Sequence, residues 1–401
     1  MFQTRIKTHH SAMSEGNKHL IGPKKVTESL NTYNTNADGK AVIYIHVPFC
    51  SKICSFCNMR RSLQKPIETY ADLIVKEIEQ YATLPYVKST VFDAVYFGGG
   101  TPTTLPTNDL RKILKALKKH LSFTLDAEFT IETTVTELTD EKMQALIEEG
   151  VTRFSVGIQT FNDNGRAQMG RVGNGLTAYE KLKRLKEYEN ITVSMDLIYN
   201  YKDQTLDDLY EDLNRIIDLD LNGFSMYSLI NMRETKIDQA QSQENDEKMF
   251  HAISEYMEKA GYHFLELTKM VKNDKYKYIM NRHQGADTLP LGAGAGGSMN
   301  GLAMMNPINL SEYEESILAF DSKSGMQFKE SYKEVVKFKG DIQTIHLPKN
   351  ETLYKDKDEY QKVLNLLLEN EMVVKKDDGY QLTTKGIFWG NSISRELSEL
   401  I

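Results

Sequence analysis

Residues 41–57 read AVIYIHVPFCSKICSFC, a run of β-branched and aromatic residues that leads into closely spaced cysteines. The first seven residues have the composition of a buried strand, and Pro48 ends the run. The three cysteines of the chain, Cys50, Cys54 and Cys57, all fall in the segment that follows. An odd set clustered this way is a poor disulfide framework, but it suits a set of thiolate ligands in a reducing compartment.

The spacing of the thiolates indicates which metal group they would hold. Three thiolates on one short loop can each bind one iron of a [4Fe–4S] cluster, which leaves the fourth iron open to a small molecule. Structural zinc would require a fourth Cys or His. His46 is the nearest fourth ligand, but strand alternation and Pro48 place it awkwardly. The plainest alternative is three small buried hydrophobic residues. The pattern favours an open-iron cluster.

Strand-like and helix-like segments alternate from residue 41 to residue 229. Strands are expected at 41–47, 92–97, 128–132, 152–158, 192–199 and 223–229, and helices at 66–81, 108–120, 140–149, 177–187 and 206–219. Such alternation is typical of parallel βαβ units with right-handed crossovers. The fold class predicted is α/β: an incomplete parallel (β/α)6 TIM-like barrel whose active site lies at the carboxyl ends of the strands.

A smaller α+β, winged-helix-like module is expected at the C-terminus. A helix at 244–260 and the segment 263–267 precede the glycine-rich loop PLGAGAGG at 290–297. Helical spacing returns at 357–370, and 372–382 has the pattern of a hairpin about Asp377-Asp378-Gly379. We divide the chain into a polar N-terminal extension (1–38), a barrel core (39–265), a glycine-rich linking and substrate region (266–324) and the C-terminal module (325–401).

The overall charge excludes one large class of function. The net charge is −7, which argues against a basic nucleic-acid binder. No apolar run approaches the roughly 20 residues that span a bilayer. The first residues are polar and lack the apolar core of a secretory signal. We therefore expect a cytoplasmic protein with neither a nucleic-acid partner nor a membrane span.

Four motifs together resemble a known family. They are YIHVPFC at 44–50 with the C-x3-C-x2-C spacing, FGGGTPT at 97–103, SVGIQTF at 155–161 and DLIY at 196–199. They look like the radical S-adenosylmethionine (SAM) enzymes, in particular the oxygen-independent coproporphyrinogen III oxidase-like group. The resemblance implies that the open iron chelates SAM and that the reduced cluster cleaves it to a 5′-deoxyadenosyl radical. It also implies an electron donor such as flavodoxin or ferredoxin.

Four polar residues lie at or just beyond expected strand ends: Glu132, Gln159, Arg171 and Asp196. Taken singly, each is as well explained as a solvated loop residue or a structural hydrogen bond. Carboxylates suit ribose hydroxyls and a sulfonium charge, and an arginine suits a carboxylate. By resemblance, two SAM molecules would contact Tyr44, Phe56, Gly99, Gly100, Thr101, Glu132, Gln159, Arg171, Asp196 and Ile230. His46 matches a family histidine that would tune the cluster through a hydrogen bond.

Other segments bear on the substrate. Asn58-Met59-Arg60-Arg61 follows the cluster loop where the oxidase often has a fourth cysteine, and Asn200-Tyr201-Lys202 replaces the family's Gly-Leu-Pro. Segments 281–297 and 382–391 resemble the heme-utilisation branch, the anaerobilin synthases.

That branch opens heme without oxygen, using SAM as radical source and methyl donor, and releases the iron. Heme, or a related tetrapyrrole, would then lie between the barrel mouth and the C-terminal module, near 291–297 and Phe388-Trp389. Arg60 and Arg61 could meet propionates or simply be surface charge, and His263 and His283 favour ordinary polar roles. A heme chaperone and a coproporphyrinogen III dehydrogenase remain as alternatives.

Overall fold

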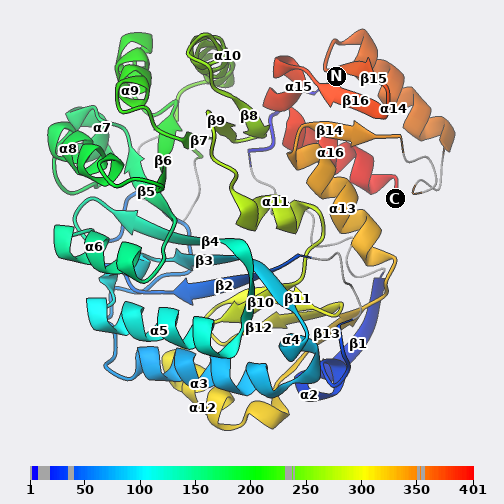
Figure 1. Cartoon of the computed structure of the whole chain (residues 1–401). Helices are drawn as coiled ribbons and strands as arrows, with labels where there is room; N and C mark the ends of the chain where they lie inside the picture. Colours follow the sequence, from blue (N-terminus) through cyan, green and yellow to red (C-terminus); the bar gives the residue numbers. More distant parts are fainter. Residues whose placement is uncertain are drawn as a thin grey trace.

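The computed structural model describes residues 2–7, 19–34, 40–230, 237, 240–349, 353 and 357–401. Its centre is a sheet in which six consecutive parallel strands curve into a partial barrel (Figure 1). These strands, which neighbour one another in chain order, are β2 (Ala41–Val47), β3 (Val91–Gly99), β4 (Ser122–Thr134), β5 (Arg153–Gln159), β6 (Thr192–Tyr199) and β7 (Gly223–Ser228). The predicted incomplete (β/α)6 barrel is confirmed.

Helices connect the parallel strands and cover their outer face (Figure 1). They are α3 (Tyr70–Thr83), α4 (Pro85–Lys88), α5 (Thr107–His120), α6 (Asp140–Glu148), α7 (Asp163–Gln168), α8 (Gly175–Lys186) and α9 (Leu206–Asp218), with η3 (Pro102–Thr104) before α5. In α9, a capping box between Thr205 and Asp208 starts the helix, and Leu209, Leu213 and Ile216 form the buried stripe. Each such side chain contributes about 1.5–3 kcal/mol when fully buried. No helix among the described residues is long and apolar enough to cross a membrane.

The sheet continues on both sides of the six strands. β10 (Thr288–Leu291) pairs in parallel with β2, and β11 (Gly296–Met299), β12 (Leu302–Met305), β13 (Ser324–Phe328) and β1 (Leu20–Lys25) follow in antiparallel order. On the other edge, β9 (Lys269–Val271) and β8 (His263–Glu266) extend β7. Segment 290–297, expected as a loop, is instead the end of β10, a turn and the start of β11, because strands of four residues are too short to show a period.

Residues outside the expected barrel core are thus built into its sheet. β1 lies in the polar N-terminal extension, and it pairs with β13 across about 300 residues of sequence. Helix α2 (Val26–Ser29) follows it. The sheet is continuous across positions 265 and 324, so the fourfold division of the chain stays a proposal about sequence segments.

A helical module with its own three-stranded sheet completes the chain. It contains α13 (Tyr332–Gln343), β14 (His346–Pro348), α14 (Lys357–Glu369), β15 (Val373–Lys376), β16 (Gly379–Leu382), α15 (Thr384–Phe388) and α16 (Gly390–Glu399). The strands are antiparallel in the order β14-β16-β15, and the predicted hairpin is β15–β16. The remaining elements are α10 (Gln243–Lys259), α11 (Lys277–His283), α12 (Leu310–Leu318) and η4 (Phe320–Ser322).

The first residues of the chain join this module to the barrel. Arg5 donates to the Phe388 carbonyl at 2.8 Å and forms an ion pair with buried Asp246 of α10 at 2.9 Å. Lys7 pairs with the same carboxylate at 2.9 Å and donates to Ser228 at the end of β7 at 2.7 Å. These contacts hold the module against the open edge of the barrel.

Candidate active site

A cavity of ≈ 300 Å³ lies at the carboxyl ends of the parallel strands. It is lined by the three cysteines and by most of the predicted ligand residues, namely Phe56, Gly99, Gly100, Thr101, Glu132, Gln159, Arg171 and Asp196. These residues come from β3 to β6 and from the loops that follow β2 and β5. The strand-end argument therefore brings together residues that are far apart in the sequence.

The cysteine loop is held in a defined shape by backbone hydrogen bonds. Cys50 N donates to Ser62 O at 2.9 Å and Ser62 N donates to Pro48 O at 2.7 Å, which closes the base of the loop. Ser55 N donates to Met169 O at 3.1 Å, which fixes the middle of the loop to the segment after α7. All three thiols are free and half-buried, and burial raises the pKa of Cys50 and of Cys57.

The donor set suits an iron–sulfur cluster. Among the described residues, no three Cys, His, Asp or Glu side chains converge on one point as a single metal ion would require. The thiolates of a [4Fe–4S] site bind different irons, so they need not converge. Cys54 Sγ accepts from Arg171 Nη1 at 3.1 Å, and Cys50 Sγ lies 3.7 Å from Thr101 Oγ1. The Thr101 contact opposes the burial that raises the pKa of Cys50 and so favours the thiolate form that iron requires.

Gly99 at the end of β3 and Gly100 directly after it are required by packing inside the protein. Gly99 has φ +116°, and a Cβ there would lie 2.7 Å from the His46 ring. A Cβ on Gly100 would lie 2.6 Å from the Phe49 carbonyl oxygen. The loop thus lies directly against β2 and the start of the cysteine segment. Close approach to a ligand, which the sequence suggested, is an additional role rather than the whole reason for these glycines.

Three buried polar atoms of residues that line the cavity have no hydrogen-bond partner among the described residues: Arg61 Nε, Gln159 Oε1 and Arg171 Nε. Gln159 itself has φ +67°, a left-handed conformation that turns the chain at the end of β5. The Arg171 guanidinium also donates to Gly157 O and to Cys54. Because unpaired buried polar atoms are costly, a polar ligand in the cavity would offset this cost.

The carboxyl groups of Glu132 in β4 and Asp196 in β6 differ in their partners. Burial raises the pKa of Glu132 to about 7, against the hydrogen bond that Tyr96 donates to it at 2.6 Å. Gly99 N donates to its second oxygen at 3.3 Å. Burial also raises the pKa of Asp196, although Lys269 and Arg153 oppose the shift. The cavity therefore holds two carboxyls whose proton affinity is increased.

Tyr44, His46 and Ile230 do not line the cavity. The ring nitrogens of His46 are 2.9 Å from Tyr44 Oη and 3.1 Å from Arg60 O. His46 therefore holds the segment after the cysteine loop, and its influence on the cluster stays a prediction. Ile230 is half-buried and is the last described residue before 231–236.

The structure corrects the expected role of the C-terminal aromatic pair. Phe388 and Trp389 are 1% and 6% exposed. The Arg5 guanidinium lies 4.1 Å from the Phe388 ring centroid, and Phe2 stacks on Trp389. These rings are part of the packing between the module and the barrel, so they do not face a substrate. His283 is bonded to Glu266 at 2.9 Å, and His263 is exposed on β8.

Sequence reasoning missed several residues of this site. Thr133, Thr134 and Thr136 line the cavity directly after Glu132, where the strand-end argument could have been continued. Below the cavity, Arg153 binds Asp274 through two hydrogen bonds of 3.0 and 2.8 Å. Nothing in the sequence signals this pair, because its members are 121 residues apart.

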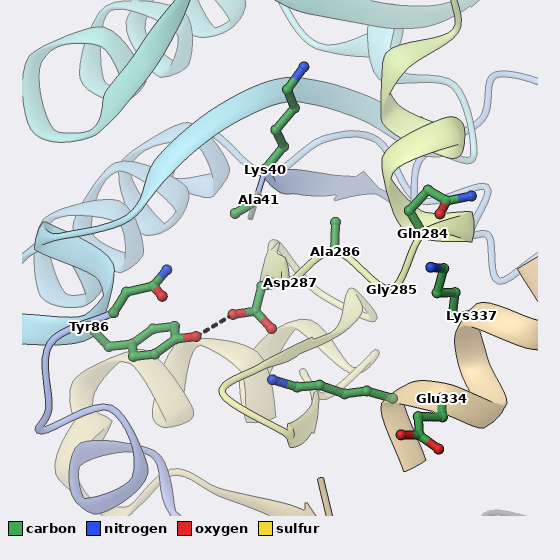
Figure 2. A pocket seen from close by; sticks show the side chains of 11 residues that line it. Lys40, Ala41, Tyr86, Gln284, Gly285, Ala286, Asp287, Glu334 and Lys337 are labelled. Carbon is green, nitrogen blue, oxygen red and sulfur yellow. Dashed lines mark hydrogen bonds between the residues drawn. The ribbon is translucent and has the colours of Figure 1, made fainter. Parts of the chain in front are cut away.

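A second cavity, of ≈ 230 Å³, lies at the amino end of β2 (Figure 2). Tyr86 Oη donates to Asp287 Oδ2 at 2.7 Å in its wall, and Lys40 and Lys337 also line it. None of the predicted site residues lines this cavity. It contains no cysteine, so the chemistry indicated by the sequence belongs to the carboxyl-end cavity.

Comparisons with known proteins agree with this geometry. A family model described as the radical SAM superfamily matches residues 44–215. The chain is 29% identical over 385 residues to the anaerobilin synthase of Escherichia coli O157:H7, covering 92% of this chain and 86% of that protein. It is 29% identical over 276 residues to the heme chaperone HemW of Lactococcus lactis subsp. lactis (strain IL1403), covering 66% and 71%.

The solved structure of coproporphyrinogen III oxidase (HemN) from Escherichia coli, described as a radical SAM enzyme, has the same fold. The TM-score is 0.78 at 20% identity, with 94% of this chain and 93% of that chain covered. Because the family match begins at Tyr44 and takes in the whole cysteine loop, and because the sequence relatives are an anaerobilin synthase and heme chaperones, the protein belongs to the radical SAM superfamily, within its HemN-like group.

Proposed function

We propose that the protein is a radical SAM methyltransferase that opens the heme macrocycle without oxygen, giving a methylated linear tetrapyrrole (an anaerobilin) and releasing iron. The observation that carries the proposal is the extent of the similarity to the anaerobilin synthase, which covers 92% of this chain and so includes most of its C-terminal part. The similarity to the heme chaperone covers 66% of this chain.

The residues around the carboxyl-end cavity have the chemistry that this activity needs. Cys50, Cys54 and Cys57 would hold a [4Fe–4S] cluster, which supplies the electron that cleaves SAM. The Arg171 guanidinium suits the carboxylate of SAM, and Gln159 Oε1 is an acceptor available to a ligand.

Two SAM molecules would share this region, one as the radical source and one as the methyl donor. Glu132 and Asp196 suit ribose hydroxyls or a sulfonium charge. Both side chains are half-buried at the cavity wall. The positive charge of a ligand bound beside them would favour the ionised forms of the two carboxyl groups. The walls of the cavity would also keep water from the reacting atoms.

A heme chaperone of the same fold is the second candidate. It is supported by the equal identity, 29%, to the heme chaperone HemW. In that case the cluster would serve stability or heme transfer, and heme would be bound without turnover.

One anaerobic incubation distinguishes the candidates. The cluster-reconstituted protein is mixed with a reductant, SAM and heme, and both the heme Soret band and the products are followed. Loss of the Soret band with a methylated open-chain product supports the proposal. Stable heme binding without turnover supports the chaperone. Turnover in a parallel incubation with coproporphyrinogen, but not with heme, supports the dehydrogenase.

A further inference from the structure

Exposed apolar side chains gather beside the cysteine loop. Met59 is 50% exposed, Met305 at the end of β12 is 54% exposed, and Ile308 just after it is 50% exposed. Arg60 lies among them, with Nη1 2.8 Å from the Met305 sulfur. We refer to Met59, Arg60, Met305 and Ile308 as the methionine patch. Large apolar side chains clustered on a surface in this way usually mark a binding site.

The patch has a rigid support. Met305 pairs with Gly296 across the β11–β12 ladder. A Cβ on Gly296 would lie 3.1 Å from Met305 Cε, so the missing side chain leaves room for the Met305 thioether. A Cβ on Gly294 would lie 3.4 Å from the Ile308 side chain and 3.5 Å from the His46 ring. The two glycines therefore leave room for the Met305 and Ile308 side chains, and His46 lies beside Gly294 while it binds the Arg60 carbonyl.

The patch adjoins the carboxyl-end cavity, because Met59 and Cys57 both line that cavity. The Arg61 guanidinium donates hydrogen bonds to the carbonyl oxygens of Cys57 and Met59. Arg60 differs, since no carboxylate of the described residues lies within ion-pair distance of it, and its side chain contacts a thioether. An exposed arginine among apolar side chains suits a ligand with a flat apolar body and a carboxylate at its edge.

We propose that the methionine patch is the docking surface for the tetrapyrrole. The apolar face of the macrocycle lies on the Met59 and Met305 thioethers and on Ile308, and one propionate carboxylate pairs with Arg60. This inference rests on the proposed function, and it replaces the buried Phe388–Trp389 pair as the surface that meets the substrate. The cavity beside Met59 then opens toward the edge of the bound ring.

The test measures binding without turnover. The cluster-reconstituted full chain, without reductant, is titrated with metal-free protoporphyrin IX and with its dimethyl ester, and porphyrin fluorescence is followed. Arg60→Gln should weaken binding of the free acid about tenfold, the effect of one lost charge-assisted hydrogen bond, and leave binding of the ester unchanged. Met305→Glu should weaken binding of both porphyrins, because it places a carboxylate under the ring.

Two variants serve as matched controls. Arg395→Gln changes an exposed arginine of α16, and Leu318→Glu changes a residue of α12 that is 66% exposed. Both should bind the two porphyrins as the wild-type protein does. Far-UV circular dichroism and SAM binding of the patch variants should equal those of the wild type, which separates docking from folding.

The inference is overturned if both patch variants bind the free acid with wild-type affinity, or if Arg60→Gln weakens the acid and the ester equally. A wild-type protein that opens heme while the patch variants keep wild-type KM would also refute the docking surface, but it would leave the proposed function intact. A wild-type protein that neither binds porphyrin nor consumes heme would refute both.

Discussion

Replacing Tyr96 with Phe tests the electrostatics of the cavity through one hydroxyl group. The Tyr96 hydroxyl donates to Glu132 Oε1 at 2.6 Å, and the ring stacks on Tyr278 at a centroid distance of 4.6 Å. Phenylalanine keeps the stacked ring and removes the donor. Glu132 is then left with the hydrogen bond from Gly99 N at 3.3 Å.

The expected change in the free energy of unfolding follows from the raised pKa of Glu132. Burial raises this pKa from 4.5 to about 7, and the Tyr96 hydrogen bond opposes the rise. The folded state therefore holds the proton more tightly than the unfolded state, so stability falls as pH rises from about 4.5 to about 7, by up to about 3 kcal/mol. A hydrogen bond to a charged acceptor contributes about 1.5–3 kcal/mol. Its loss moves the pKa further upward by about 1–2 units.

The expected result is a pH-dependent loss of stability, measured by urea unfolding of the cluster-free chain. Tyr96→Phe should cost about 1–2 kcal/mol near pH 8.5 and much less near pH 5, where the Glu132 carboxyl is protonated. Glu132→Gln should remove this part of the pH dependence. Asp212, whose pKa burial also raises to about 7, contributes equally to all three proteins and cancels in the differences. An equal loss at both pH values, or an unchanged slope in Glu132→Gln, would refute the reasoning.

Three further predictions concern the cofactors. Anaerobic reconstitution should load about four irons per chain, and Cys54→Ala should lose iron and SAM cleavage while keeping the wild-type circular dichroism; a fully active variant would contradict the cluster assignment. Gly99→Val should abolish SAM binding, measured by equilibrium dialysis, since its Cβ would lie 2.7 Å from the His46 ring and φ is +116°; normal binding would show that the loop can shift at no cost. Asp196→Ala and Arg171→Ala should retain iron and weaken SAM binding, and SAM cleavage at the wild-type rate by both would show that the strand-end residues do not handle SAM.

The sequence predicted those parts of the fold whose signal is local. β2 and β6 have the predicted limits, Ala41–Val47 and Thr192–Tyr199, because each is rich in β-branched and aromatic residues and is bounded by turn residues. β1, β10 and β13 were not expected. Their residues are few, and their partners lie far away in the chain, so pairing rather than composition makes them strands.

The same distinction applies to the site. Glu132, Gln159 and Asp196 follow from one rule, that parallel strands end at one edge of the sheet, and all three line the cavity. The Tyr96–Glu132 bond and the burial of Phe388 follow no such rule. They depend on which side chains meet between neighbouring strands and on how residues 2–7 contact the C-terminal module.

Transfer of the SAM methyl group is the most direct test of the proposed activity. The reduced, cluster-loaded protein is incubated without oxygen with heme and with SAM carrying an isotopic label in its methyl group, and the products are separated and analysed by mass spectrometry. We predict loss of the Soret band, release of iron and a ring-opened tetrapyrrole that contains the label. A ring-opened product without SAM-derived carbon, formed at an undiminished rate, would contradict the methyltransferase mechanism, and unaltered heme would contradict the activity itself.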